Sequence, residues 1–380
     1  MKICLIHNTW EEHARRGAEQ FILTVTRALR AAGHDVSIIT TRPWFKRAPH
    51  TPKAEQVYCL GSGYSYLEHW PLYARFVWHL CNVANPVKYF QIKKILDQKQ
   101  PDIVWTHNLT GLGFLAFAAA KKYKHWHTIH DIQLLHPSGL LMYGNEKMLE
   151  SFFSRIYQSI SGFFITKKSI IISPSAWLLK LHQDYGFFKD NDQRVSPNPL
   201  EAKYFSKNIS SKIKKEFSNF LYVGQIEAHK GISLLIAAAA EIQNPRFSLR
   251  LIGNGSLLEN CVTKNKDPRI VFLGQQTSSR VREEMDQASC LVVPSICYEN
   301  QPTVVFEAIA SNLPAIGSNF AGVHEMLKDN HLLFEPTREN LKKKMEYVME
   351  NLEEMAGYAN EAYSSLRITS AEEYILLLPW

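Results

Sequence analysis

The sequence predicts an α/β protein with two doubly wound parallel sheets, each with its own hydrophobic core. Apolar, β-branched segments alternate with helical patterns along both halves of the chain, and this alternation breaks once, around residues 196–205. A chain of 380 residues also exceeds the size at which a single core usually stops growing, about 250–300 residues. We therefore expect one domain over residues 1–198, a second over 199–365, and a C-terminal helix over 366–380 that packs back on the first domain.

The first half opens with a strand, a helix and a second strand. The first strand covers residues 2–7, and the second covers 35–40 after Gly33 ends the helix. One stripe of this helix is apolar at helical spacing and consists of Ala18, Phe21, Ile22, Val25 and Leu29. Further strands are expected at 102–106, 125–129 and 169–173.

The second half repeats the alternation. Strands are expected at 219–224, 247–253, 269–274, 290–294 and 314–318, and the chain reads as helical from residue 340. Open parallel sheets bind ligands at the carboxyl ends of their strands. Glycines and polar residues gather at these ends in both halves: Gly17, His107, Asn108, His130, Asp131, Gly224, Gln225, Lys230, Gly253 and Gly255. They predict a ligand cleft between two sheets.

Composition and charge narrow the class of protein. The six cysteines show no zinc-type spacing and several lie in apolar strands, which favours a reducing compartment without disulfides. No apolar run reaches the roughly 18 residues of a membrane span, and the N-terminal strand is too short for a signal peptide. The net charge of +7 suits nucleic acid, phosphorylated ligands or an anionic membrane surface, but no nucleic-acid recognition motif accompanies it.

The stretch 298–307, YENQPTVVFE, holds an informative pair of acids, Glu299 and Glu307. Pro302 suits the first turn of a helix, whose free N–H groups from Thr303 onward can bind an anion. A carboxylate beside a bound phosphate suits the vicinal hydroxyls of a ribose, so Glu307 would bind a ribose and Glu299 a second sugar. The alternative is structural, because acids near a helix N-terminus stabilise the helix by roughly 0.3–1 kcal/mol each.

Four other positions can be interpreted either as part of a ligand site or as ordinary structural residues. Lys230 follows a strand and can reach phosphate oxygens, or it is a solvated surface lysine. Gly17 lets a phosphate approach a helix start, or it serves a turn. His130, followed by Asp131, is a site residue or a satisfied core histidine, and Gly253 permits a turn.

Taken together, these segments resemble the GT-B retaining glycosyltransferases of glycosyltransferase family 4. The resemblance covers nearly the whole chain and rests on the E-x7-E pattern of Glu299 and Glu307. Supporting motifs occur in family order: RGAE (16–19), TIHD (128–131), SPNPLE (196–201), GQIEAHKG (224–231) and LIGNG (251–255). The resemblance implies two Rossmann-like domains facing across a cleft, and transfer of a sugar from a nucleoside-diphosphate sugar to an acceptor hydroxyl. It implies retention of configuration, no cofactor and no metal; the sequence shows no clear Asp-x-Asp pair.

The resemblance also assigns roles by position. It implies catalytic roles for His130 near the transferred sugar, Lys230 at the leaving diphosphate and Glu299 at the donor sugar. The donor would be bound by Arg16, Gly17, Gln225, Gly253, Val271, Phe272, Asn300, Gln301, Pro302, Thr303 and Glu307. Among these, Val271 and Phe272 lie where the family's base pocket is usually built.

Two positions depart from the family pattern. Gln225 stands where the family usually has an arginine, and Arg16 with Gly17 replaces a pair of glycines. One alternative is therefore a nucleotide-sugar-binding protein with weak or lost catalysis. Another is a nucleotide-sugar epimerase or a phosphorylase on the same fold, which interconversion of free nucleotide sugars or dependence on phosphate would identify.

The expected partners are a UDP or GDP sugar and a saccharide or lipid-linked acceptor, with no nucleic acid. Aromatic residues are dense at 63–80. Three interpretations are open: together with residues 44–47 they form an acceptor groove, they rest on an anionic membrane, or they pack as a core helix. We expect a cytoplasmic protein, peripheral at the cytoplasmic face of the membrane, in cell-surface polysaccharide or glycolipid synthesis.

Overall fold

The computed structural model describes residues 1–10, 17–44, 56–64, 67, 70–200 and 218–380. Arg16 and parts of the segments 44–47, 63–80 and 196–205 lie outside these residues. The described chain divides into two compact units. Unit 1 holds Met1–Leu141, Asn145–Pro199 and Ala371–Trp380, and unit 2 holds Met142–Gly144 and Leu200–Ser370.

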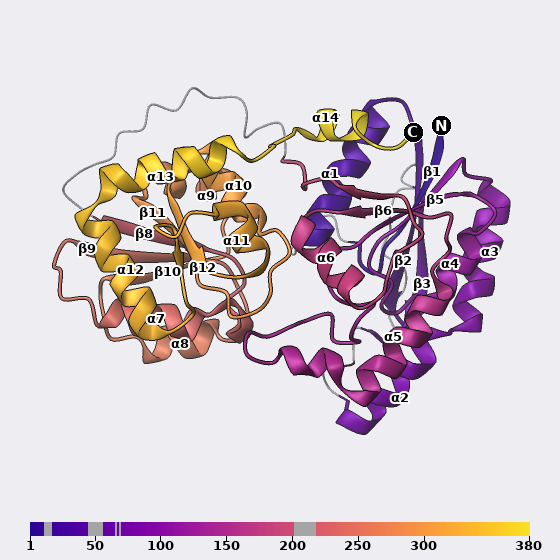
Figure 1. Cartoon of the computed structure of the whole chain (residues 1–380), viewed down its shortest axis with the longest axis horizontal. Coiled ribbons are helices and arrows are strands. Elements are labelled where there is room, and N and C mark those ends of the chain that lie inside the picture. Colours follow the sequence, from indigo (N-terminus) through magenta and orange to yellow (C-terminus); the bar gives the residue numbers. More distant parts are fainter. Residues whose placement is uncertain (11–16, 45–55, 65–66, 68–69, 201–217) are drawn as a thin grey trace. The chain divides into compact units, whose positions relative to one another are not determined.

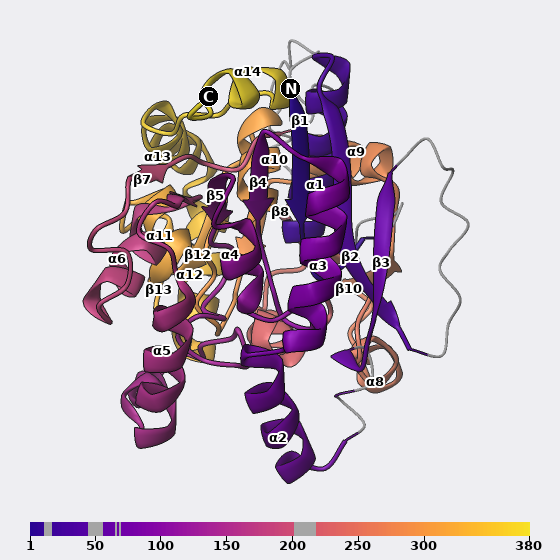
Figure 2. The ribbon, with the colours of Figure 1, turned by 90° about the vertical axis from the view of Figure 1, so that its right-hand side faces the viewer.

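Unit 1 is built on a seven-stranded parallel sheet in the order β3-β2-β1-β4-β5-β6-β7. The strands are β1 (Lys2–Ile6), β2 (Asp35–Pro43), β3 (Val57–Ser62), β4 (Ile103–Thr106), β5 (Lys124–Thr128), β6 (Ile170–Ser173) and β7 (Gln193–Val195). The helices are α1 (Gly17–Ala31), α2 (Leu72–Val83), α3 (Pro86–Lys99), α4 (Leu115–Ala120), α5 (Phe152–Phe164), α6 (Ala176–Asp184) and α14 (Ala371–Leu376), with a 3₁₀ turn at Glu146–Glu150. They lie on both faces of the sheet (Figures 1 and 2).

Unit 2 is built on a six-stranded parallel sheet in the order β10-β9-β8-β11-β12-β13. The strands are β8 (Ser218–Val223), β9 (Phe247–Ile252), β10 (Ile270–Gly274), β11 (Cys290–Val293), β12 (Ala315–Ser318) and β13 (Leu333–Phe334). The helices are α7 (Ile232–Ala240), α8 (Leu258–Lys264), α9 (Ser278–Gln287), α10 (Thr303–Ala310), α11 (Ala321–Leu327), α12 (Arg338–Glu350) and α13 (Leu352–Ser364), and Ala228–Lys230 forms a 3₁₀ turn.

The prediction of two doubly wound parallel sheets is confirmed, and every predicted strand is present. Three short strands were not predicted: β3, β7 and β13, each at the edge of its sheet. Edge strands are paired on one side only; β3 and β7 lack the buried pattern of the inner strands, and β13 has only two residues. β7 illustrates this, because Arg194 and Val195 are both exposed.

The C-terminal segment belongs to unit 1. Helix α14 packs against α1, where Tyr374 meets Phe21 edge-on with ring centroids 5.6 Å apart. The ring of Trp380 stacks on His34 at 5.0 Å and contacts Trp126 at 5.3 Å. The structure therefore ties the end of the chain to the first sheet by aromatic contacts, beginning at Ala371.

Each sheet has one point at which the strand order reverses: between β1 and β4 in unit 1, and between β8 and β11 in unit 2. Ligands of open parallel sheets bind beside such switch points, at the carboxyl ends of the strands. His7 and His107 follow β1 and β4, while Gly224 and the loop of Glu299 follow β8 and β11. The predicted site residues Gln225, Lys230 and Glu299 therefore lie beside the switch point of unit 2, whereas Val271 and Phe272 lie in the edge strand β10.

Candidate functional site

The centre of the site in unit 2 is an ion pair between Lys230 and Glu299. Lys230 Nζ donates a short hydrogen bond to Glu299 Oε1, which also accepts from Ser295 Oγ at 2.7 Å. The two side chains are only 22% and 15% exposed. Two residues that the sequence analysis places at different parts of a ligand are thus direct partners of each other.

Both members of this pair are charged at neutral pH. Burial by itself raises the pKa of Glu299, but the Lys230 ammonium and the hydrogen bonds from Lys230 and Ser295 outweigh it, so the pKa lies below its ordinary value. Burial lowers the pKa of Lys230, and the charge of Glu299 more than reverses this, so the pKa lies above its ordinary value. The turn after β8 therefore holds a largely buried cation paired with a carboxylate.

The turns after β8 and β11 are bound to each other. His229 O accepts hydrogen bonds from Ile296 N at 3.0 Å and from Cys297 N at 3.2 Å. Gly231, the N-cap of α7, has φ +73, and a Cβ there would lie 1.8 Å from Pro294 O. Because only glycine fits this close approach, the sequence fixes the start of α7 beside the loop that carries Glu299.

Helix α10 begins directly after that loop. Its N-cap is Pro302, which has no side-chain acceptor to cap the helix, and α7 likewise begins without a side-chain cap at Gly231. The N-termini of helices present N–H groups and a partial positive charge, so both helix starts favour an anion. Thr303 is the first residue of α10 and Glu307 the fifth, and the Glu307 side chain is half-buried.

The glycines of the GNG motif bring a third turn to the same edge of the sheet. A Cβ on Gly253 would lie 1.7 Å from Gly224 O, and one on Gly255 would lie 2.4 Å from Ile226 O. The backbone bonds Gly224 N to Ile252 O and Ile226 N to Asn254 O join the turns after β8 and β9. The structure therefore explains Gly253 by the close packing of two turns. Gln225 lies in the first of these turns, where its carbonyl accepts from Tyr222 OH at 2.7 Å.

Gly322 is a candidate site residue that was not predicted from the sequence. Its N–H donates to Glu299 O at 2.9 Å, and a Cβ there would lie 1.5 Å from Asn300 O. It is the second residue of α11, so the start of this helix holds the backbone of the loop that carries Glu299 and Asn300. The signal was present in the sequence, since Gly322 follows strand β12 as the other site glycines follow theirs.

Aromatic side chains surround the same loop. Phe320 packs against Tyr298 at 4.9 Å between ring centroids and stacks on Tyr143 at 4.8 Å. Tyr143 comes from the short segment Met142–Gly144 that belongs to unit 2, and its hydroxyl donates to Glu335 Oε2 at 2.9 Å. Its backbone N–H donates to Ile296 O at 2.9 Å, which joins this segment to the turn after β11. The sequence analysis did not identify Tyr143.

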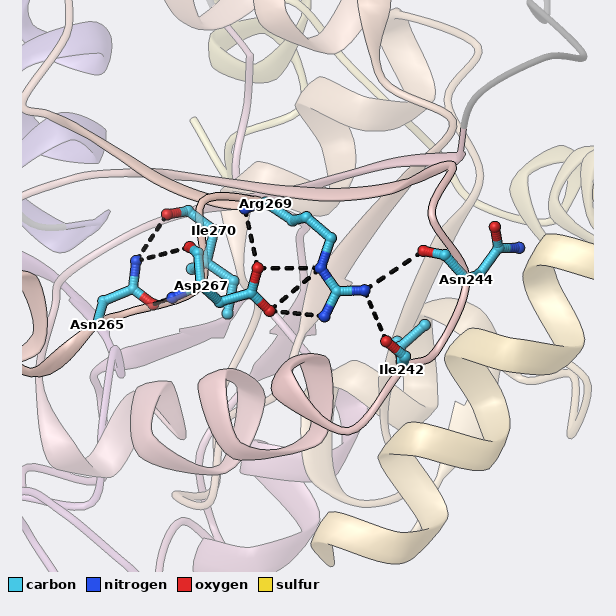
Figure 3. Close-up of polar contacts among 6 residues, drawn as sticks. All are labelled: Ile242, Asn244, Asn265, Asp267, Arg269 and Ile270. Carbon is cyan, nitrogen blue, oxygen red and sulfur yellow. Dashed lines mark hydrogen bonds and ion pairs between the residues drawn. The ribbon is translucent and has the colours of Figure 1, made fainter.

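Val271 and Phe272 lie in β10, at the edge of the second sheet, where Val271 is exposed and Phe272 is half-buried. Arg269 fixes the start of this strand (Figure 3). Its guanidinium forms an ion pair with Asp267 at 2.6 Å and donates to the carbonyls of Ile242 at 2.7 Å and Asn244 at 3.3 Å. Hydrogen bonding to Arg269 lowers the pKa of Asp267. This network holds the two candidate base-pocket residues on a fixed strand.

In unit 1, histidines gather at the carboxyl ends of β1, β4 and β5. His130 Nε2 lies 3.1 Å from His107 Nδ1, within hydrogen-bond distance, and the two rings stack at 5.3 Å. The ring of His7 lies edge-on to both, at 6.1 and 6.5 Å. Burial lowers the pKa of His130 and of His7 to about 3, so all three rings are neutral at physiological pH. Gly17 is exposed at the start of α1.

Asp131, next to His130, is held by amide donors. Asn108 Nδ2 donates to Asp131 Oδ2 at 2.9 Å, and the backbone N–H of Gln133 donates to Oδ1 at 2.8 Å. Burial nevertheless raises the pKa of Asp131 to about 6. The neutral imidazole and the adjacent carboxylate therefore offer uncharged and charged hydrogen-bonding groups side by side.

The buried histidines of unit 1 make stability depend on pH. Burial lowers the pKa of His182 from 6.5 to about 4, so its contribution is complete above pH 6.5 and is lost as the pH falls toward 4. His182→Gln should remove one proton from this titration and reduce the slope of unfolding free energy against pH by about 1.4 kcal/mol per pH unit. Urea unfolding of both proteins at several pH values between 4 and 7 measures the slopes, and equal slopes would contradict the expectation.

Among the described residues, no cluster of three or more His, Cys, Asp or Glu side chains is arranged to hold a metal ion. Within the same residues, no helix is both long enough and apolar enough to cross a bilayer. Of the described residues to which the resemblance assigns roles, Gly17 and His130 lie in unit 1 and all the others lie in unit 2.

Two family models match the chain one after the other. Residues 15–203 match Glycosyltransferase Family 4, and residues 205–365 match Glycosyl transferases group 1. The chain belongs to the GT-B glycosyltransferases of family 4. The resemblance stated from the motifs is thereby confirmed for the family and the fold, and the likeness extends over both units.

A putative teichuronic acid biosynthesis glycosyltransferase of Bacillus subtilis, TuaC, is 25% identical over 360 residues, covering 88% of this chain and 86% of that protein. Two solved structures share the fold. Sucrose-phosphate synthase from Thermosynechococcus elongatus has a TM-score of 0.72 at 19% identity, over 99% of this chain and 96% of that chain. Anabaena HepE in complex with UDP has a TM-score of 0.70 at 15% identity, over 99% of this chain and 98% of that chain.

Proposed function

We propose that this glycosyltransferase moves a sugar from a nucleoside-diphosphate sugar to an acceptor hydroxyl with retention of configuration. The proposal rests mainly on one arrangement in unit 2. The Lys230–Glu299 ion pair lies at two turns that are hydrogen-bonded to each other. These turns lead into α7 and α10, which begin without side-chain caps. A cation and two helix N-termini at one sheet edge suit a diphosphate. A carboxylate beside them suits sugar hydroxyls rather than phosphate.

In this proposal the protein supplies preorganised charge. Breaking the bond between the sugar and the diphosphate develops negative charge on the leaving oxygen, which Lys230 and the N–H groups at Thr303 and beyond would stabilise. The acceptor oxygen bonds to the anomeric carbon on the face that the diphosphate leaves, and its proton passes to the leaving phosphate oxygen. We propose that the positive charge of these groups lets transfer proceed without a metal or any other cofactor.

The remaining residues would bind the donor. Glu307 would accept the two hydroxyls of the ribose, and Glu299 those of the transferred sugar, while Asn300 and Gln301 line the loop between them. Val271 and Phe272, on the fixed strand β10, would contact the base. His130 would meet the transferred sugar as a neutral imidazole, consistent with its lowered pKa. Gly17 and Arg16 would lie near the phosphates.

The donor is proposed to carry uracil, because HepE has been solved with UDP and with UDP-glucose. The link of TuaC to teichuronic acid supports an acceptor in cell-surface polysaccharide or glycolipid synthesis. We place the protein at the cytoplasmic face of the membrane, with segment 63–80 as one contact.

Gln225 supports a second candidate, a nucleotide-sugar-binding protein with weak catalysis, because its amide supplies no charge where the family usually has an arginine.

Glu307→Ala should weaken binding of the preferred nucleotide by about ten- to a hundredfold, because two hydroxyl-to-carboxylate hydrogen bonds are lost, each worth about 1.5–3 kcal/mol before solvation of the freed hydroxyls. Calorimetric titration with UDP, GDP and ADP, each with and without Mg²⁺, measures the affinity and its dependence on metal. Glu350→Ala, which removes an exposed glutamate at the end of α12, is the matched control.

The outcomes separate the candidates. Tight binding of one nucleotide without Mg²⁺, lost only in Glu307→Ala, supports the site, and turnover of the matching sugar donor then distinguishes a transferase from a binding protein. Failure of the folded protein to bind any nucleotide would reject the proposed donor site. Interconversion of free nucleotide sugars, or a requirement for inorganic phosphate, would reject transfer in favour of an epimerase or a phosphorylase.

A further inference from the structure

Helix α5 of unit 1 is amphipathic, but it buries its polar face and exposes its apolar face. Its inward face is polar and consists of Ser154, Tyr157, Gln158 and Ser161, all buried. Its outward face carries Phe152, Phe153 and Phe163, which are 72%, 66% and 84% exposed. A surface helix of a globular domain normally buries its apolar stripe instead. The sequence analysis did not single out this helix.

Specific hydrogen bonds fix this orientation. Gln158 Nε2 donates to Leu149 O at 2.9 Å and to Leu135 O at 3.2 Å, and Ser161 Oγ donates to Leu134 O at 2.6 Å. Ser154 and Tyr157 likewise donate to backbone carbonyls, at 2.7 and 2.8 Å. Rotating the phenylalanines inward would leave these buried carbonyls without donors, and each buried acceptor without a partner costs free energy.

A second helix of unit 1 exposes an apolar stripe. Tyr73, Val77 and Leu80 of α2 are exposed and follow one another at helical spacing. Figures 1 and 2 both place α2 and α5 in the lower part of unit 1. Exposed apolar side chains gathered in this way mark an interaction surface more often than chance exposure does.

The charges around α5 indicate which kind of partner this surface binds. Residues 146–168 contain Lys147, Arg155, Lys167 and Lys168 against Glu146 and Glu150, and neither α5 nor α2 contains an acid. Lys167 is paired with Asp190 at 2.6 Å, so the exposed Lys147, Arg155 and Lys168 against Glu146 and Glu150 leave a surplus of one positive charge. Phenylalanines flanked by cations suit an anionic lipid surface, whereas a two-fold contact with a second copy would bring these like charges together.

We propose that α5 docks the protein on an anionic lipid bilayer, with Phe152, Phe153 and Phe163 inserted among the acyl chains and Arg155 and Lys168 at the headgroups. The stripe on α2 is a second exposed apolar surface of unit 1. This adds a second helix to the membrane contact proposed at 63–80, and it is independent of sugar transfer.

Flotation of the full chain with vesicles, without any nucleotide, tests the proposal. The protein should float with vesicles of phosphatidylcholine and phosphatidylglycerol, and less with phosphatidylcholine alone or at high salt. Phe152→Gln combined with Phe163→Gln should weaken binding to the mixed vesicles by at least about tenfold. The matched control, Val262→Gln with Leu376→Gln, removes exposed apolar side chains from α8 and α14 and should bind as the wild type does.

Several results would overturn the proposal: no flotation of the wild type with mixed vesicles, equal flotation of the phenylalanine variant, or equal loss in the control. Sedimentation of both variants in the absence of lipid would also overturn it, because the loss of flotation would then result from aggregation. A wild-type dimer that the phenylalanine substitutions dissociate would assign the surface to a second copy. Thermal unfolding confirms that both variants fold, and because these assays use no sugar donor, their failure leaves the transferase proposal untouched.

Discussion

Lys230→Met is expected to slow release of the nucleoside diphosphate from the sugar donor by about 10²–10³-fold, because one preorganised cation at the leaving group is typically worth that much. The substitution also leaves the carboxylate of Glu299 buried without its cation, with only Ser295 Oγ donating to the same oxygen among the contacts described above. It should therefore lower the unfolding temperature as well. Steady-state kinetics with the preferred donor measure the first effect, and calorimetry measures the second.

The double variant Lys230→Met/Glu299→Gln separates the two effects. Removing both charges relieves the uncompensated carboxylate, so we expect the unfolding temperature to recover toward that of the wild type. The rate should not recover, because the charge that stabilises the leaving diphosphate is still absent. Recovery of the rate together with stability would show that Lys230 acts only as a structural partner of Glu299.

Gly322→Ala is expected to displace the loop of Glu299 and Asn300 and to abolish measurable nucleotide binding. The new Cβ would lie 1.5 Å from Asn300 O and 2.8 Å from Glu299 O, and these are backbone atoms that no rotamer change can move away. Overpacking of a tight site usually costs about 1–3 kcal/mol. We expect at least this loss in the free energy of unfolding, measured by urea denaturation, with nucleotide affinity measured by calorimetric titration.

Gly357→Ala is the matched control for this substitution. Gly357 lies inside α13, and a Cβ there would meet nothing within 4 Å. Alanine in an open helix interior is favoured over glycine by up to about 1 kcal/mol, so this variant should be equal to or more stable than the wild type. Unchanged stability and nucleotide affinity in Gly322→Ala would refute the role given to the start of α11.

Local sequence patterns were sufficient for the two sheets. Apolar runs such as 290–294 predict inner strands because both faces of such a strand are covered, and glycines at strand ends mark the turns. The same patterns place Glu299, Lys230 and His130 at the carboxyl ends of strands. The edge strands β3, β7 and β13 were not predicted, because β3 and β7 lack the buried pattern of the inner strands and β13 has only two residues.

Contacts between segments far apart in the chain were decided by the tertiary structure. The Lys230–Glu299 ion pair joins residues 69 positions apart, and it forms because β8 and β11 are neighbours in the sheet, which no local pattern encodes. Gly322 and Tyr143 reach the same loop from two further segments for the same kind of reason. A sequence can show that a residue stands at a strand end, but which strand ends meet depends on the order of the strands.

Helix α5 shows the limit most clearly. Its sequence determines that it is an amphipathic helix, and the usual rule would turn the phenylalanines toward the core. The backbone carbonyls of Leu134, Leu135 and Leu149 need donors, and Ser161 and Gln158 supply them, so the polar face turns inward. The sequence by itself thus determined the inner strands and the amphipathic faces of the helices. Only the tertiary structure decided which face each element buries, because that choice depends on the hydrogen-bonding groups it meets.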